Sequence, residues 1–507
     1  MCYNIIMKSE ENSSRKPAAT VRTRFAPSPT GYIHVGNVRS ALFPFLLAKQ
    51  AQANGTKDSA FILRIEDTDQ ARFVAGAEQL ILETLTWLGI SWDEGPELNG
   101  KEKGDFAPYH QTSRKEIYYK YAEKLVREGF AYADPTTSEQ IQKYREECEK
   151  LKLPFLFRNM RPENPPQWTP NCGLPLRFCA KNLKNYHWHD EVFGDLSAGA
   201  ESLDDFILIK SDGLPTYNFA HIVDDHEMKI THVIRGAEYI SSMPKYLSLY
   251  DALGISWPIF AHLPHILAPD GKKKLGKRDG AKSVNEYRED GYLPEAMVNF
   301  LAQLGWNDGT EQDVFTMSEL IAKFSLDRVQ KSGARFDEKR LIWLNGQWIR
   351  RISLDDLYSR SENFWGENGA KTPETSRKKV LKIVQERMKT LRDLPDLTEY
   401  FFARSKPNWQ MIRKNKQLAK FEKEDLVGLL KVSRAKFAKL DEKDFANTET
   451  LQNNLNELLT ETDQKPAILF SIIRYALTWA PFSPGLPETM SVLGREETLA
   501  RLDAAIK

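Results

Sequence analysis

The stretch that decides the fold covers residues 21–50, VRTRFAPSPTGYIHVGNVRSALFPFLLAKQ. Residues 21–26 alternate like a short β-strand, and the proline- and glycine-containing segment 27–31 that follows is typical of a turn. Residues 33–50 then carry apolar side chains at helical spacing. Because a strand, a turn and a helix form the repeating unit of parallel sheets, this segment predicts an α/β fold.

Outward from this segment, strand and helix patterns return and then give way to helices. Residues 60–65 and 230–236 predict strands, and residues 75–88 and 244–253 predict helices. Residues from about 104 to 210 are proline-rich and weakly periodic, which predicts a domain inserted between two halves of the sheet. The expected divisions are a flexible leader 1–20, sheet halves 21–104 and 211–283, the insertion 105–210, and helical domains 284–350 and 351–507.

Length and composition exclude several classes of protein. The 507 residues are too many for one core and indicate roughly three domains. With 41% hydrophobic and 28% charged residues the chain is typical of globular proteins, and its apolar runs are shorter than a membrane span. The net charge of +1 favours no class of partner. The four cysteines lack the paired spacing of a zinc site, so free thiols in a reducing cytoplasm are expected.

Two segments carry residue types that bind phosphate. His34 and Gly36 lie where the predicted turn meets the predicted helix, and the unpaired N–H groups of a helix N-terminus favour an anion. His34 would contact a phosphate oxygen, and Gly36, lacking a Cβ, would let a purine approach the backbone. Lys274 and Lys277 belong to a basic loop at 269–280, where cations suit the charge of a transferring phosphoryl group. Each segment alone is at least as typical of an ordinary turn or solvated loop.

Together these segments resemble the HIGH and KMSKS signatures of class I aminoacyl-tRNA synthetases, here HVGN at 34–37 and KLGKR at 274–278. The stretch RFAPSPTGYIHVGN at 24–37 is similar to bacterial-type glutamyl-tRNA synthetases. Further similar stretches are LRIEDTD at 63–69, residues 204–226, ITHVIRGAEY at 230–239 and residues 334–350. The resemblance implies an α/β fold with a Rossmann-like parallel sheet, an inserted acceptor-binding domain and an all-α anticodon-binding region.

The resemblance also implies a glutamate site. Arg24 and Arg235 would hold the side-chain carboxylate of glutamate, because guanidinium is permanently charged and binds carboxylate bidentately. Glu66 would accept from the substrate ammonium group, although a cap at the end of a strand is the alternative for this residue. The remaining pocket residues implied are Ala26, Ser28 and Tyr217.

For ATP, the resemblance implies the residues His34, Gly36, Glu238, Lys274 and Lys277, with Mg²⁺ accompanying the nucleotide. His34, Lys274 and Lys277 would be the catalytic residues, because they would stabilise the departing pyrophosphate. The chain departs from the family at Gly276, which replaces the usual serine and makes the loop more flexible. Where many relatives carry a cysteine-rich zinc site, residues 130–135 contain no cysteine, so no structural zinc or other protein-bound metal is expected.

The helical C-terminal region contains the expected contacts to tRNA. Arg387 is the best candidate reader of the third anticodon nucleotide. Basic clusters at 377–382, 387–392 and 413–423 are interleaved with aromatic residues at 400–402 and 409, a combination that suits single-stranded RNA. A solvated helix face with inward-pointing aromatics is the alternative.

The resemblance implies a glutamate–tRNA ligase that forms glutamyl-adenylate and transfers the glutamyl group to the terminal adenosine of tRNA(Glu). Bound tRNA is expected to be required for the first step. A monomer in the cytoplasm is expected, with no membrane partner. Charging of tRNA(Gln) as well stays open. Three rivals are a glutamyl-queuosine synthetase, which normally ends before the helical region, a glutaminyl enzyme, whose counterpart of residues 26–30 usually differs, and a non-catalytic tRNA-binding paralogue.

Overall fold

The computed structural model describes residues 20–31, 33–276 and 282–507. The chain divides into two compact units. Unit 1 comprises Met1–Asn285 and Val298–Asp337, and unit 2 comprises Glu286–Met297 and Glu338–Lys507. No helix among the described residues is both long enough and apolar enough to span a bilayer.

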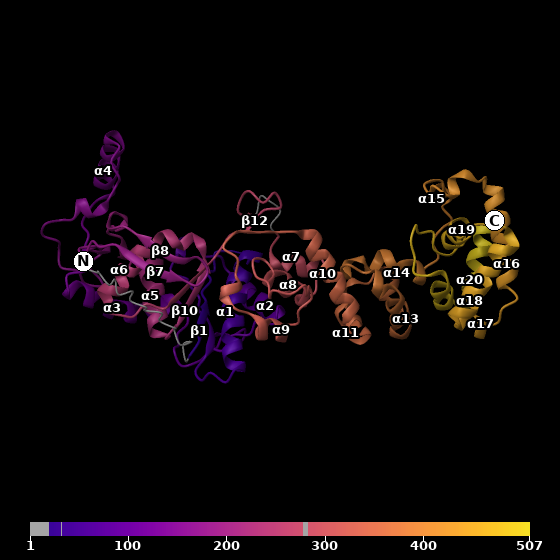
Figure 1. Ribbon diagram of the computed structural model, residues 1–507, viewed down its shortest axis with the longest axis horizontal. Coiled ribbons are helices and arrows are strands. Elements are labelled where there is room, and N and C mark those ends of the chain that lie inside the picture. The colour runs from indigo at the N-terminus through magenta and orange to yellow at the C-terminus, as the bar shows by residue number, and fades with distance from the viewer. Residues whose placement is uncertain (1–19, 32, 277–281) are drawn as a thin grey trace, which may run out of the picture. The chain divides into compact units, whose positions relative to one another are not determined.

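Unit 1 is built on parallel strands, three of which the sequence predicts at 21–26, 60–65 and 230–236. Strand β1 pairs with β2, and β10 pairs with β11, both in parallel. The two pairs lie side by side, because the Thr231 N–H donates to the Arg22 carbonyl at 2.9 Å. Figure 1 shows β1 and β10 as neighbours although their colours differ. The strands of unit 1 are β1 (Arg22–Phe25), β2 (Ala60–Leu63), β3 (Gly95–Pro96), β4 (Glu102–Lys103), β5 (Ala131–Ala133), β6 (Leu176–Phe178), β7 (Tyr186–Asp190), β8 (Gly194–Ala198), β9 (Ile207–Ile209), β10 (His232–Gly236), β11 (Ile259–Leu263), β12 (Ile266–Leu267) and β13 (Ala334–Arg335).

Helices follow the strands at the predicted places. Helix α1 buries Val38, Leu42 and Phe45, which recur at helical spacing along one face. The Thr23 hydroxyl donates to the Pro44 carbonyl at 2.8 Å, so β1 and α1 are also joined by a polar contact. The helices of unit 1 are α1 (Val35–Ala53), α2 (Ala77–Trp87), α3 (Lys115–Arg127), α4 (Ser138–Leu151), α5 (Tyr217–Glu227), α6 (Met243–Leu253) and α9 (Met317–Lys323), while α7 (Val284–Glu289) and α8 (Pro294–Ala302) each divide between the units.

The region expected as an insertion contributes one small sheet of its own and one hairpin that joins another sheet. Strands β5, β6 and β9 form one antiparallel sheet. The hairpin β7–β8 instead extends the sheet of β10 and β11, and Asp190 pairs in parallel with Phe260. The side chains of Tyr186, Trp188 and Asp190 are buried, and those between them are exposed. Periodicity alone does not reveal that this hairpin joins the parallel sheet.

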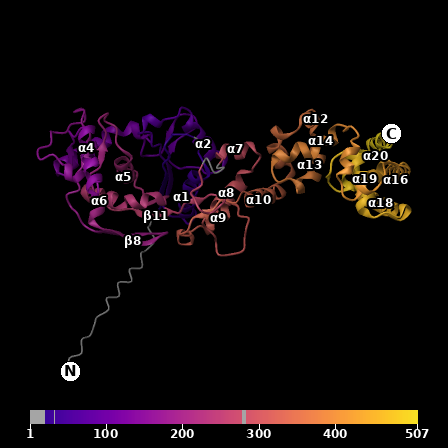
Figure 2. The same ribbon diagram turned by 90° about the horizontal axis from the view of Figure 1, so that it is seen from above.

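Unit 2 is helical throughout its longer segment. Asn345 joins three of its segments, since its side chain accepts from the Leu293 N–H at 2.8 Å and donates to the Lys389 carbonyl at 2.6 Å. The helices near the C-terminus, yellow in Figure 2, share one apolar core. The helices are α10 (Glu338–Arg351), α11 (Leu354–Arg360), α12 (Glu367–Ala370), α13 (Glu374–Val384), α14 (Leu394–Phe402), α15 (Trp409–Arg413), α16 (Lys423–Phe437), α17 (Glu442–Ala446), α18 (Thr448–Thr462), α19 (Pro466–Thr478) and α20 (Leu486–Ile506).

Two of the aromatic residues expected to stack on RNA contact other side chains of unit 2. Tyr400 is buried, and Trp409 lies edge-on to Trp479 with ring centroids 5.9 Å apart. Burial of Tyr400 favours the inward-pointing alternative for this residue. Trp409 is half-buried, so a stacking role for its side chain stays a prediction.

One titratable contact in unit 1 makes the stability of the fold depend on pH. His110 lies between Glu78 and Glu102, with each ring nitrogen 3.0 Å from a carboxylate oxygen. The hydrogen bond to Glu78 is the main cause that raises the pKa of His110 to about 9, against the opposing effect of burial. Protonated His110 therefore stabilises the fold fully below its unfolded pKa of about 6.5, and this contribution is lost as the pH rises towards 9.

We therefore expect the free energy of unfolding of the parent, relative to His110→Gln, to fall by up to about 1 kcal/mol between pH 6.5 and pH 9. Glutamine cannot gain a proton, so the variant lacks this part of the pH dependence. Urea unfolding at several pH values measures it. Parallel profiles for parent and variant would contradict the role of His110.

Candidate active site

The first candidate segment forms the N-terminus of α1. His34 is the cap residue, and its Nδ1 accepts from the Gly36 N–H at 3.0 Å, while Asn37 Oδ1 accepts from the His34 N–H at 3.2 Å. A Cβ on residue 36 would lie 2.9 Å from His34 Cε1. A side chain at this position would therefore push the imidazole off the backbone, a constraint that the sequence did not suggest.

A cavity of about 130 Å³ opens at this helix terminus. Lys274 Nζ lies 3.3 Å from Glu238 Oε1, and His265 Nδ1 lies 3.7 Å from the other oxygen of this carboxylate. A helix N-terminus and a lysine on one cavity favour an anion such as phosphate. The lining residues are His34, Val35, Gly36, Asn37, Arg39, Ser40, Gly236, Glu238, Leu263, Pro264, His265, Ile266, Lys274 and Leu275.

Four of the five expected ATP residues thus line one cavity: His34, Gly36, Glu238 and Lys274. The fifth, Lys277, lies outside the described residues, as does its neighbour Arg278. The structure adds that Glu238 holds Lys274 by an ion pair, so an arriving anion competes with a carboxylate for this cation.

Arg235, at the end of β10, is a buried cation with unusual partners. Its side chain donates to His262 Nε2 at 3.2 Å, approaches His221 Nε2 at 3.4 Å and points at the Met243 sulfur at 3.1 Å. Among the described residues, no carboxylate forms an ion pair with it. Because a buried charge without a counter-ion is costly, this site favours an anionic ligand.

Aromatic side chains surround the same guanidinium. Its carbon lies 4.9 Å from the Tyr239 ring centroid and 4.8 Å from that of Tyr246, within the range of cation–π attraction. Tyr217, half-buried at the start of α5, stacks on His221 at 4.6 Å. Burial is the main cause that lowers the pKa of His221 well below its ordinary value, followed by the charge of Arg235. The imidazole is therefore neutral at pH 7.

Arg24 has a different environment from Arg235. Its Nε donates to Asp225 at 3.1 Å and its Nη1 donates to the Ile234 carbonyl at 3.2 Å. Both side chains are buried, so this is a compensated ion pair. Arg24 is accordingly less available to an added carboxylate than Arg235.

Glu66 is also buried and is held by an arginine that the sequence reasoning overlooked. Arg64, fully buried, donates to Glu66 at 3.0 Å and to Asp225 at 2.8 Å. Burial raises the pKa of Glu66 to about 7, although Arg64 opposes the shift. A cation bound beside Glu66 would favour its ionised form. Arg64 lies within the LRIEDTD stretch that the sequence analysis identified, but the sequence did not indicate that it binds Glu66.

The segment of Ala26 and Ser28 adjoins Glu66 through the backbone. The Glu66 N–H donates to the Pro27 carbonyl at 3.0 Å, which places the loop after β1 next to the loop after β2. Ala26 is half-buried and Ser28 is exposed. The structure therefore brings the start of the turn and Glu66 together.

Arg387 ends a short 3-10 segment of unit 2, Gln385–Arg387, and is exposed. Its charge acts on Tyr400 and on Arg474, where it adds to burial in lowering the pKa of Arg474. Two cations that repel one another favour an anionic partner between them.

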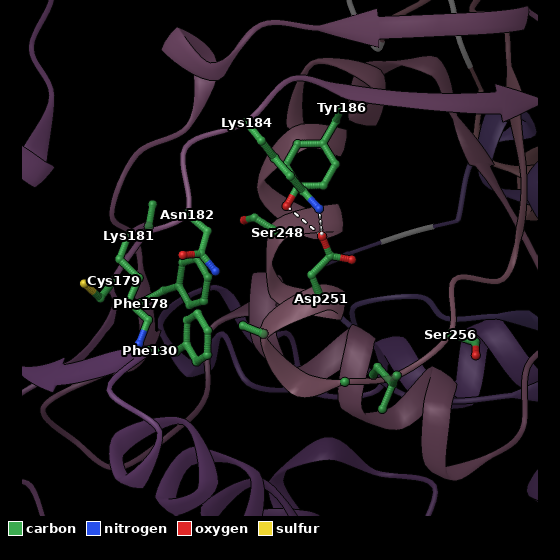
Figure 3. Close-up of a pocket in the computed structure, with 14 residues that line it drawn as sticks. Phe130, Phe178, Cys179, Lys181, Asn182, Lys184, Tyr186, Ser248, Asp251 and Ser256 are labelled. Carbon is green, nitrogen blue, oxygen red and sulfur yellow. Dashed lines mark hydrogen bonds and ion pairs between the residues drawn. The ribbon is translucent and has the colours of Figure 1, made fainter.

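A second cavity, of about 570 Å³, lies in unit 1 away from these motifs (Figure 3). Asp251 binds Tyr186 at 3.0 Å and Lys184 at 2.7 Å on one carboxylate oxygen, as the dashed lines show. Lys181 is turned towards the Phe130 ring, 3.9 Å from its centroid. None of the candidate catalytic residues lines it, so its size alone does not make it the active site.

The residues that the structure describes contain no group of three or more His, Cys, Asp or Glu side chains suited to a metal ion. Cys148, Cys172 and Cys179 are free thiols. The absence of structural zinc stays a prediction.

Two family matches cover the chain. Residues 20–343 match the family "tRNA synthetases class I (E and Q), catalytic domain", and residues 356–506 match the family "Anticodon binding domain". The fold and the candidate sites thus define a class I tRNA synthetase of the glutamate and glutamine branch.

Individual relatives are similar along nearly their whole length. The chain is 40% identical to "Glutamate--tRNA ligase" of Clostridium botulinum over 96% of this chain and 98% of the relative. It is 41% identical to that of Dehalococcoides mccartyi over 96% and 97%. A crystal structure of a glutamate tRNA ligase from Elizabethkingia meningosepticum in complex with its amino acid has a TM-score of 0.82 at 34% identity, over 96% of this chain and 99% of that one.

The chain therefore belongs to the glutamate–tRNA ligase family. The fold class and the family expected from the sequence are confirmed, and the chain is an aminoacyl-tRNA ligase. The finer division into six segments and the roles of individual site residues stay predictions.

Gly36→Ala tests the geometry of the His34 turn. The new Cβ would meet His34 Cε1 at 2.9 Å, so the imidazole must rotate off the backbone. We expect kcat/KM for ATP in aminoacylation to fall by about tenfold or more, because a displaced catalytic group is costly.

Gly428→Ala is the matched control, since Gly428 lies in α16 with nothing within 4 Å of an added Cβ. This variant should keep parental activity and gain about 0.5–1 kcal/mol of stability, because alanine is the better helix former. Parental activity in Gly36→Ala would contradict the steric role of residue 36.

Proposed function

We propose that this enzyme activates L-glutamate with ATP and transfers the glutamyl group to the 3'-terminal adenosine of tRNA(Glu). The observation that carries the choice of amino acid is Arg235, a buried guanidinium without a carboxylate partner among the described residues. The side-chain carboxylate of glutamate supplies the missing anion and binds the guanidinium bidentately.

Several neighbours fit the rest of glutamate. Tyr217 lies beside His221 near Arg235 and shapes the pocket. Glu66 accepts from the substrate ammonium group, whose charge offsets the cost of ionising a buried carboxyl. Ala26 and Ser28 line the floor beside it. Arg24, already paired with Asp225, contributes its positive field more than a direct bond.

The reaction proposed has two steps. The α-carboxylate of glutamate attacks the α-phosphorus of ATP in line, and pyrophosphate leaves with the bridging electron pair. His34, Lys274 and Lys277 stabilise the charge that appears on pyrophosphate, while Gly36 and Glu238 complete the nucleotide site. The 2'-hydroxyl of the tRNA adenosine then attacks the carbonyl of glutamyl-adenylate and releases AMP. Mg²⁺ would be held mainly by the ATP phosphates, as it commonly is.

The helical unit 2 supports recognition of tRNA. Arg387 is the proposed reader of the third anticodon nucleotide, and its exposure leaves the guanidinium accessible to a base edge. We further propose that bound tRNA is required for the first step and that the enzyme works as a cytoplasmic monomer. Comparing the charging of purified tRNA(Glu) and tRNA(Gln) tests whether the second tRNA is also a substrate.

Arg235→Gln tests the choice of amino acid. We expect the parent to prefer glutamate over glutamine by about a hundredfold or more in kcat/KM, because the amide of glutamine turns donors towards guanidinium donors. The variant should lose most of this preference, chiefly through lost glutamate activity. Aminoacylation with each amino acid at saturating tRNA and ATP measures the ratio.

Arg22→Gln is the matched control, because Arg22 is a buried arginine of β1 that already pairs with Glu94 at 2.8 Å. This variant should lose stability and keep the preference. A parental preference in Arg235→Gln would show that Arg235 is a structural arginine.

Lys274→Ala tests the phosphate role of the basic loop. A cation that meets charge developing in the transition state affects kcat more than KM, so we expect kcat for pyrophosphate exchange to fall by about a hundredfold. Lys272→Ala removes a neighbouring exposed lysine that does not line the cavity and should remain near parental. Equal losses in the two variants would contradict a specific role for Lys274.

A further inference from the structure

We infer that Asp190 and His262 are positioning residues for glutamate selection: they fix the tautomer of one imidazole so that its lone pair orients Arg235 towards the substrate. This inference rests on the proposed glutamate site. Neither residue belongs to the motifs at 34–37 or 274–278, and Asp190 comes from the region expected as an insertion.

The contacts of Asp190 are all with donors. Its carboxylate is fully buried and accepts from the backbone N–H groups of Val192 at 3.0 Å, Phe193 at 2.9 Å and His262 at 3.2 Å. It also lies 2.6 Å from His262 Nδ1. Burial pushes the pKa of Asp190 up, but these hydrogen bonds outweigh it and lower the pKa below its ordinary value. An ionised carboxylate can only accept, so Nδ1 of His262 must carry a proton.

That proton decides what the other face of the ring can do. Burial lowers the pKa of His262 although Asp190 opposes the shift, so the ring is neutral and carries one proton only. Nε2 is therefore a lone pair, and the Arg235 Nε–H donates to it at 3.2 Å. The tautomer with its proton on Nε2 would place the His262 Nε2–H against the Arg235 Nε–H.

His221 holds the second edge of the same guanidinium in the same way. Its Nδ1 lies 2.6 Å from the Tyr217 carbonyl, which can only accept, so this nitrogen carries the ring proton. Nε2 then presents a lone pair to Arg235 Nη1 at 3.4 Å. Two neutral rings thus hold the Arg235 guanidinium, and no carboxylate among the described residues forms an ion pair with it.

Neutral imidazole acceptors orient the Arg235 guanidinium without neutralising the positive charge that the substrate carboxylate would bind. Arg24 and Arg64 both bind Asp225 directly, and their charges are compensated within the fold. Arg235 instead receives its orientation from imidazole, and the carboxylate of Asp190 stays one ring away. The full charge of Arg235 is therefore available to the carboxylate of glutamate, whereas the neutral amide of glutamine gains little from it.

Asp190→Asn is the sharpest test because it changes one atom. The amide can keep its oxygen on the N–H groups of Val192 and Phe193, which turns its NH2 towards His262 Nδ1. The ring then carries its proton on Nε2, facing the donor of Arg235. We expect the KM for glutamate to rise by about ten- to a hundredfold and the preference over glutamine to fall, with the KM for ATP unchanged.

Asp205→Asn is the matched control. Asp205 is another buried carboxylate of the insertion, and it binds Arg161 and Tyr132. This variant should lose stability without any change in the ratio of glutamate to glutamine. An equal loss of preference in both variants would overturn the inference, because general loosening of the insertion would then suffice.

Two substitutions of His262 separate positioning from support of the strand. His262→Gln places an acceptor near Nε2 and keeps the contact to Arg235, whereas His262→Asn places a donor near Nδ1 and keeps only the contact to Asp190. We expect the Gln variant to stay closer to the parent in glutamate KM than the Asn variant. The reverse order would overturn the inference, since a purely structural pair needs the Asp190 contact.

The tautomer can be observed directly by ¹⁵N NMR of histidine-labelled protein, which has nine histidines. The signal lost in His262→Gln should show a protonated Nδ1 and an unprotonated Nε2, and the opposite assignment would overturn the inference. A parent that forms no glutamyl-tRNA would overturn the proposed function too. Lost preference in Arg235→Gln with full preference in Asp190→Asn would overturn this inference alone.

Discussion

Buried carboxylates at the C-terminal end of α5 hold unit 1 together. Asp225 binds Arg24 of β1 and Arg64 after β2, while Asp224 binds Arg114 at 2.7 Å. Because an unpaired buried charge costs several kcal/mol, none of these groups can leave the others without penalty. These ion pairs therefore tie α5 to β1, to the segment after β2 and to the segment before α3.

Arg235 is the exception within this compensated network, and the proposed glutamate site rests on that exception. Its neighbours are imidazole, phenol and thioether groups, which solvate a cation weakly and leave its charge whole. The cavity at the N-terminus of α1 differs in kind, because there Lys274 forms an ion pair with Glu238. In the proposed function, ATP would therefore replace one counter-ion of Lys274 by another, whereas glutamate would supply the first carboxylate to Arg235.

The sequence was sufficient for the fold class and the family, whereas the roles that it suggests for individual site residues stay predictions. The periodicity of apolar residues and the turn-forming residues predicted the bounds of β1, α1 and β10 to within a few residues, because local patterns determine such elements. The similarity of short motifs singled out Arg235 and Lys274 as candidates. Asp190 and His262 could not be found in this way, because their pairing depends on β7 joining β11, a contact between residues 72 positions apart. The burial of Tyr400 likewise depends on tertiary packing, which the clusters of basic residues in the sequence do not reveal.

The hairpin β7–β8 also limits where this chain can be divided into separate domains. A chimaera that exchanges residues 105–210 with those of a relative would replace a strand of the catalytic sheet and, with it, the carboxylate that holds His262. The insertion is therefore not an interchangeable module, however much its sequence resembles one. Under the proposed role of Asp190, a remodelled version of this region must keep an acceptor at position 190.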